Sequence, residues 1–103
     1  MTATPPAAPS APANMPRSYL SAEEKEELLR LGKSEDYICL RESQKAGRAG
    51  DEEAAWAWMA KRKLTAHSLR FLKRRMGAQF IRERGFNTEN ADAIHGSDWL
   101  DKD

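Results

Sequence analysis

Three features that are scarce or missing in this sequence limit the cellular compartments in which the protein is expected to work. The chain has a single cysteine, Cys39, which cannot form a disulfide within the chain. It has no apolar run close to the ~20 residues that cross a bilayer. Residues 1–20 lack the basic segment and following apolar segment of a secretory signal peptide. These features favour a cytoplasmic setting without a membrane partner.

Residues that could carry catalysis or hold a metal are also few. The two histidines, His67 and His95, and Cys39 are not spaced as metal ligands. The run YICL surrounds the cysteine with apolar neighbours, which is typical of a core position rather than a nucleophile. No glycine-rich phosphate loop occurs. We therefore expect a protein that is not an enzyme and has no cofactor or metal.

Proline is confined to one end of the chain. All five prolines lie within residues 1–16, among alanine, serine and threonine. Repeated proline removes backbone donors and favours an extended chain. We predict a disordered tail over residues 1–20, followed by a single helical domain over residues 21–103.

Helix signals recur along the rest of the sequence. Ser21 with Glu24 forms a capping box, and Gly32 marks the end of that helix. Ser34 begins a second helix that runs to about Ala46. Further helices are predicted from Asp51, over residues 66–84, and from Thr88 to Gly96, with a last turn at 97–100. Gly85 followed by Phe86 predicts a Schellman ending for the helix over residues 66–84. The fold class is all-α, a small bundle of four or five helices.

Residues 51–84 leave one question open. Thr65 could begin a new helix, or the segment could be one helix of roughly 50 Å. Gly77 marks either close packing or a real break. Trp56 and Trp58 point about 200° apart on a helix, so only one can face the core with Met59. The other faces another helix of the domain or another subunit.

Charge is strongly segregated along the chain. Residues 22–53 carry ten acidic and six basic groups, a net charge of −4. Residues 54–84 carry nine basic groups against one acid, a net charge of +8, and residues 85–103 return to −4. Such asymmetry indicates the kind of partner rather than the fold.

A helix over residues 66–84 would place its apolar and basic residues on opposite sides. The apolar stripe is Leu69, Leu72, Met76 and Phe80, and arginines lie opposite it. Arginine forks fit phosphate geometry, and an aromatic side chain among them could stack on a base. The residues predicted to bind nucleic acid are Lys61, Arg62, Lys63, His67, Arg70, Phe71, Arg74, Arg75 and Arg82.

The same basic side allows other interpretations. It could bind an acidic protein surface, it could simply be solvated, or the acidic segment before it could cover it. Tryptophan is often an anchor at interfaces, and a C-terminal turn could dock on the body or on a partner. The residues predicted for a partner interface are Trp58, Trp99 and Leu100.

One family resemblance covers residues 64–95. The run LTAHSLRFLKRRMG followed by AQFIRERGFNTENADAI resembles the helix-turn-helix domains of phage-repressor-type regulators. By that resemblance Thr88 would cap a recognition helix, and Glu89 and Asn90 would enter the major groove. A break at Leu64–Thr65 with a helix at 88–95 would favour this arrangement. One unbroken helix with an exposed Trp58 would favour an oligomer instead.

Two classes of function remain. The first is a small nucleic-acid-binding regulator or adaptor, homo-oligomeric, that grips the phosphate backbone of DNA ahead of RNA through residues 61–84. The second is an oligomeric protein-assembly adaptor, such as a phage-type small DNA-packaging (terminase small) subunit, or a small inhibitor of a larger enzyme. In the assembly case the helix over residues 51–84 would build the oligomer, and the acidic C-terminus would engage a motor or another basic partner.

Overall fold

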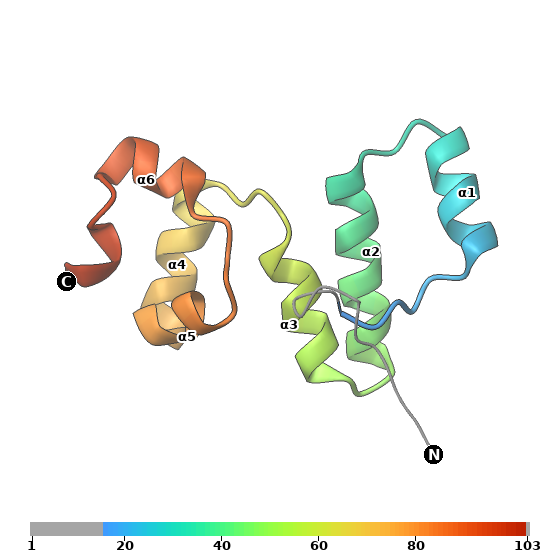
Figure 1. The fold of residues 1–103 in the computed structure, drawn as a ribbon, viewed down its shortest axis with the longest axis horizontal. Coiled ribbons are helices and arrows are strands. Elements are labelled where there is room, and N and C mark those ends of the chain that lie inside the picture. Colours follow the sequence, from blue (N-terminus) through green and yellow to red (C-terminus); the bar gives the residue numbers. More distant parts are fainter. Residues whose placement is uncertain (1–15, 103) are drawn as a thin grey trace, which may run out of the picture.

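The computed structural model describes residues 16–102, and every regular element in that range is helical (Figure 1). The all-α prediction is therefore confirmed for the described residues. Most of the predicted tail, residues 1–15, lies outside them. The elements are α1 Ala22–Arg30, α2 Glu35–Arg48, α3 Glu52–Ala60, α4 Ala66–Met76, α5 Ala78–Glu83, α6 Glu89–His95 and the 3-10 helix η1 Trp99–Asp101.

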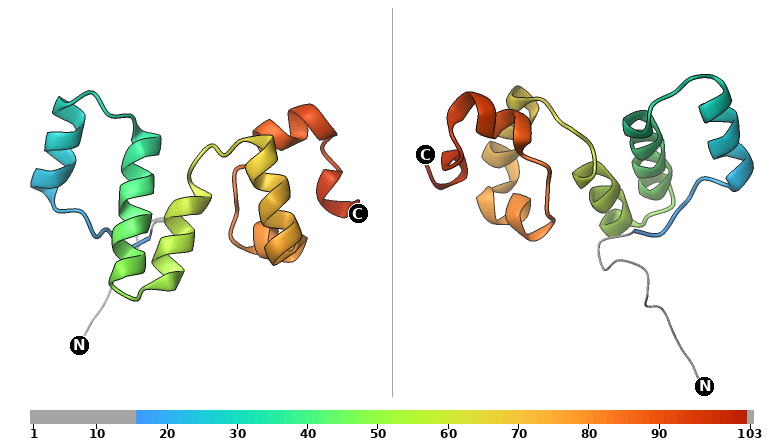
Figure 2. Two further views of the ribbon diagram at one scale, coloured as in Figure 1. Left: turned by 180° about the vertical axis from the view of Figure 1, so that it is seen from behind. Right: turned by 45° about the horizontal axis from the view of Figure 1, so that its top comes forward.

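Two apolar clusters organise these helices. α2 and α3 form an antiparallel hairpin around the first cluster, which contains Ala46, Ala54 and Trp58. α4, α5, α6 and η1 surround the second cluster, in which Leu69 and Ile81 are fully buried. Within the hairpin, α3 is the helix that lies toward α4, α5 and α6, with α2 on its other side (Figures 1 and 2).

The position of α3 answers the question raised by its two tryptophans. Trp58 faces the first cluster and is 7% exposed. Trp56 faces the second cluster, where its ring meets Phe80 edge-on with the centroids 5.0 Å apart. Both tryptophans therefore pack inside one chain, and α3 is apolar on two sides because it joins two cores.

Local hydrogen bonds set most helix ends as the sequence predicts. The Ser21 capping box is present in full. At the end of α5, Phe86 N–H donates to the Ile81 carbonyl and Gly85 N–H to the Arg82 carbonyl, which is a Schellman ending. Helix α2 continues two residues beyond the predicted Ala46, through a glycine that adopts helical geometry.

Helices α4 and α5 replace the single helix expected over residues 66–84. Thr65 caps α4, so α3 and α4 are also separate. Gly77 ends α4 with φ +95° and ψ 158°, a conformation essentially restricted to glycine. A Cβ at this position would have no atom within 4 Å, so the glycine is needed for the break rather than for close packing. Because α4 stops there, Met76 is 43% exposed, contrary to its predicted place in the apolar stripe.

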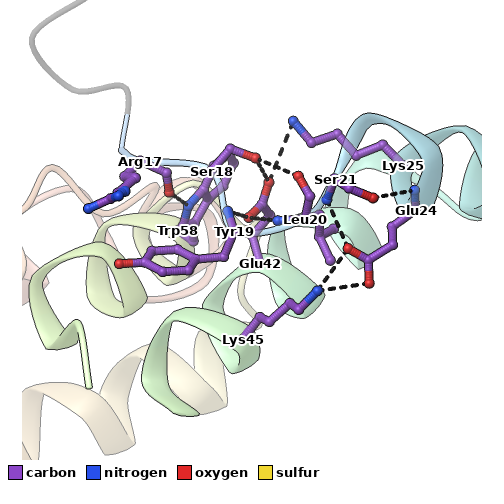
Figure 3. A network of polar contacts seen from close by, with 10 residues as sticks. All are labelled: Arg17, Ser18, Tyr19, Leu20, Ser21, Glu24, Lys25, Glu42, Lys45 and Trp58. Atoms are coloured by element: carbon purple, nitrogen blue, oxygen red, sulfur yellow. Dashed lines mark hydrogen bonds and ion pairs between the residues drawn. The ribbon is translucent and has the colours of Figure 1, made fainter. Parts of the chain in front are cut away.

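A buried carboxylate fastens the N-terminal segment to α2. Glu42 is fully buried, and its Oε1 accepts hydrogen bonds from the backbone N–H groups of Tyr19 (2.5 Å) and Leu20 (3.0 Å) (Figure 3). Its Oε2 accepts from the Ser18 hydroxyl (2.5 Å) and lies 3.6 Å from the Lys25 ammonium. Residues 17–20, assigned to the tail from the sequence, are thus part of the folded structure.

Helix α1 stands apart from the rest of the protein. None of its residues is buried, and Leu29 is 57% exposed. Leu31, at its end, is 63% exposed. The ion pairs Glu24–Lys45 (2.8 Å) and Lys25–Glu42 tie it to α2 (Figure 3). Acidic α1 lies at the far end of the molecule from α4, so it does not cover the basic side of α4 (Figure 1).

Candidate nucleic-acid interface

Helix α4 holds its basic side rigidly because its other side belongs to the second core. Leu69 is fully buried there, and Ala66 is 8% exposed. Facing away from this core, α4 presents five exposed basic or aromatic side chains, called here the α4 basic surface. They are His67, Arg70, Phe71, Arg74 and Arg75.

The α4 basic surface combines unpaired guanidinium groups with an exposed aromatic ring. Within residues 16–102, no carboxylate lies within ion-pair distance of Arg70, Arg74 or Arg75. Phe71 is 52% exposed, and the Arg75 guanidinium lies 5.7 Å from its ring centroid. Arginines one turn apart on a helix can reach successive oxygens of a polyanion.

Two other predicted contact residues, at the α3–α4 loop, are engaged inside the chain. Arg62 donates to Asp36 Oδ2 through Nη2 (2.9 Å) and Nε (3.2 Å). These hydrogen bonds are the main reason why the pKa of Asp36 lies below its ordinary value. Lys63 pairs with Glu89 at 3.0 Å, but both side chains are more than 60% exposed, so this pair is weak and holds Lys63 less firmly than Asp36 holds Arg62. Lys61 beside them is exposed and has no acidic partner among the described residues.

Arg82 does not share the α4 basic surface. Its predicted position assumed that one helix continued through Gly77, and the break at that residue changes the direction of the chain. Arg82 lies on α5 and forms an ion pair with Asp101 in η1. The sequence therefore assigned too many residues to one side of a helix.

A basic cavity that the sequence did not indicate adjoins the α4 basic surface. It has a volume of about 390 Å³ and lies between α4 and the chain from the end of α6 to the residue after η1. Among the described residues, no acidic side chain lines it. Its lining residues are Arg70, Lys73, Arg74, His95, Trp99 and Lys102.

Lys73 extends from α4 to the far wall of this cavity. Its ammonium donates to the backbone carbonyls of Trp99 (2.8 Å) and Lys102 and lies 5.7 Å from the centre of the Trp99 ring. On the helical wheel Lys73 falls near the apolar stripe, and Lys102 sits in an acidic tail. Only the return of η1 onto α4 brings these cations and His95 together, which is why sequence periodicity missed them.

The three residues predicted for a partner interface pack within the chain instead. Trp58 is 7% exposed and its Nε1–H donates to the Arg17 carbonyl (2.8 Å). Trp99 is 5% exposed and its Nε1–H donates to Asp92 Oδ1 (2.8 Å). Leu100 packs partly buried against the second core. The C-terminal turn thus docks on the body of the protein.

Helix α6 occupies the place of a recognition helix in the resemblance described above, but two of its polar side chains contact other parts of the chain. Glu89 pairs with Lys63, and the Asn90 amide donates to the Leu64 carbonyl (2.9 Å). Its one large apolar side chain, Ile94, is 69% exposed. In this structure α6 has few free polar groups that could bind base edges, whereas α4 presents arginines that could bind the phosphate backbone of a nucleic acid.

The chain matches no protein-family model, no curated protein and no solved structure. Within residues 16–102, none of the helices combines the length and the apolar character needed to cross a membrane. The geometry of α4 and of the adjoining cavity is therefore the main guide to function.

Proposed function

We propose that this protein binds nucleic acid through the phosphate backbone, with the α4 basic surface as the contact. The observation that carries the proposal is the exposure of Arg70, Arg74 and Arg75 on one side of a rigid helix without acidic partners among the described residues. Side chains already paired with carboxylates gain less from a phosphate, because the first partner must be given up.

The expected binding depends little on base sequence. Contacts to phosphates fix position without reading bases, and α6 has two of its polar side chains engaged. The separation of α3 from α4 and the presence of α6 are features that the resemblance to repressor-type domains requires. Phe71 adds a ring on which an unpaired base can stack. We place double-stranded DNA first, with single strands as the ligand that would use Phe71.

Charge reversal tests the proposal. The variant Arg70→Glu with Arg74→Glu should lose at least tenfold in affinity for duplex DNA, since two phosphate contacts become repulsive. The control is Lys33→Glu with Arg48→Glu, which makes the same change in net charge on the acidic half, and it should bind nearly as the parent does. Equal losses in both variants would mean that net charge, and not this surface, controls binding.

A second candidate function, self-assembly, rests on a different observation. Leu29 on α1 and Leu31 at its end are largely exposed, and α1 carries four glutamates against one lysine and one arginine. The α4 basic surface of a second copy has the complementary charge and the exposed Phe71 ring. Such a head-to-tail contact uses two different surfaces and would build rings or filaments. Light scattering on the parent and on the double variant Leu29→Gln with Leu31→Gln tests this contact. We expect the parent to have the mass of an oligomer and the double variant the mass of a monomer. Monomeric masses for both proteins would refute self-assembly.

A further inference from the structure

We infer that the basic cavity beside α4 is a seat for a phosphate monoester, and that in the proposed function this group is the terminal phosphate of a nucleic-acid strand. The choice of a nucleic-acid end as the source of the phosphate rests on the proposed function. The choice of a phosphate monoester as the ligand rests on the cavity alone.

The cavity is positively charged on both walls. Arg70 and Arg74, one helical turn apart, form the α4 wall. Lys102 and His95 line the opposite wall, and Lys73 reaches across from α4 to add its charge to that wall. With no acidic side chain among the described lining residues, an anion entering the cavity meets cations from several directions.

The distribution of these cations favours a monoester over an internal phosphodiester. A monoester carries a charge of about −1.5 to −2 at neutral pH and has three terminal oxygens. A backbone phosphate carries one negative charge, and its chain continues on both sides, so it must pass through the cavity rather than end in it. The volume of about 390 Å³ is at the small end of ordinary ligand sites and has room for more than a phosphate group.

The two lysine ammonium groups of the cavity differ in how firmly they are held in place. The Lys73 ammonium is fixed by two carbonyls and is therefore a permanent part of the wall. Lys102 is 3.5 Å from Asp98 in a pair whose members are both more than 60% exposed. Such a pair is weak, so the Lys102 ammonium can turn toward a bound phosphate at little cost.

Two arginines connect the cavity with the α4 basic surface. Arg70 and Arg74 belong to both, while Phe71 and Arg75 face only the outer side. A strand whose backbone runs along the outer side of α4 would bring its end to the mouth of the cavity. This arrangement predicts a protein that distinguishes the end of a strand from its middle.

The test compares strands of one sequence that carry a 5′-phosphate, a 3′-phosphate or hydroxyls only, with a closed circle as the ligand without ends. The full chain should bind one phosphorylated strand about tenfold more tightly than the hydroxyl strand, the effect of roughly one charge-assisted hydrogen bond. Equal affinity for all three strands would overturn the inference. Binding of the circle reports separately on the proposed function, because a circle has only internal phosphates.

Two matched variants locate the effect. His95→Ala with Lys102→Ala should abolish the preference for the phosphorylated end and leave affinity for the circle unchanged. Phe71→Ala with Arg75→Ala should weaken all ligands by the same factor and keep the preference. A preference that persists in the first variant would place the phosphate elsewhere and refute the site. Circular dichroism of both variants controls for folding.

Competition by a nucleoside monophosphate separates the two sources of the ligand. If it displaces the phosphorylated strand only at concentrations far above that of the strand, the strand end is the ligand. If it binds as tightly as the strand does, the site takes free phosphate monoesters. A nucleoside monophosphate that fails to compete at any concentration would contradict a monoester seat.

Discussion

Replacing Glu42 should destabilise the protein more than replacing any exposed glutamate. Its carboxylate is fully buried and satisfies the backbone N–H groups of Tyr19 and Leu20. Glu42→Ala removes the acceptor and leaves both donors without a partner, one of them buried. An unsatisfied buried group costs about 1–3 kcal/mol and the loss of an ordinary hydrogen bond about 0.5–1.5 kcal/mol, so the variant should lose about 2–4 kcal/mol of unfolding free energy. That is a large part of the roughly 5–15 kcal/mol typical of a domain.

A second variant separates hydrogen bonding from charge. Glu42→Gln keeps an oxygen for the two N–H groups, and its amide can donate to the Ser18 hydroxyl. It loses only the attraction to Lys25, whose ammonium is 3.6 Å away. We expect a loss of about 1 kcal/mol. The exposed Glu26 on α1 is the control, and Glu26→Ala should change stability by less than about 0.5 kcal/mol.

Urea unfolding followed by tryptophan fluorescence measures all three variants. Trp58 is a suitable reporter because its Nε1–H is bonded to Arg17, in the segment that Glu42 holds (Figure 3). The expected order of destabilisation is Glu42→Ala, then Glu42→Gln, then Glu26→Ala. A Glu42→Ala variant within about 0.5 kcal/mol of the parent would refute the role assigned to this carboxylate.

Further predictions concern backbone strain, thiol reactivity and acid stability. Gly77→Ala should lower the unfolding free energy by about 1–3 kcal/mol in thermal unfolding, because the backbone at this position has a φ of +95°. Gly47→Ala in α2 should raise the unfolding free energy by about 0.5–1 kcal/mol. If both variants were stabilised, or both destabilised, this account of the two glycines would be wrong. Burial raises the pKa of Cys39, so a thiol reagent at neutral pH should label it slowly until denaturant is added, and fast labelling of the native protein would oppose the packing described. The Lys45 ammonium is the main cause lowering the pKa of Glu24 from 4.5 to about 2. The stability that this ion pair contributes is therefore complete above about pH 5 and is lost as the pH falls toward 2. Lys45→Met should make the acid-unfolding profile less steep in that window, and an unchanged profile would argue against the pair.

Sequence reasoning succeeded where a few neighbouring residues decide the outcome. The capping box at Ser21 and the Schellman ending at Gly85 depend on hydrogen bonds within six residues, so their patterns are visible in the sequence. The last turn around Trp99 was expected for the same reason. Its docking on the body, rather than on a partner, was left open because that choice depends on the tertiary fold.

The features that escaped prediction all depend on segments distant in sequence. Glu42 looks like an ordinary helix-surface acid until residues 17–20 return to it from more than twenty positions away. The cavity needs η1 to fold back on α4, and periodicity of α4 alone cannot reveal that. Gly77 was recognised as unusual, but its positive φ, and hence the removal of Arg82 from the basic side, could be seen only in the structure.

The most direct test of phosphate binding by α4 is the salt dependence of DNA affinity. Fluorescence anisotropy of a labelled duplex should be measured over several salt concentrations, with the protein mass checked by light scattering in the same buffers. Contacts from Arg70, Arg74 and Arg75 predict that log K falls with log salt with a slope of about −3, and that the slope approaches zero when all three are replaced by alanine. No binding at low salt, or a slope unchanged by these replacements, would contradict the proposed function.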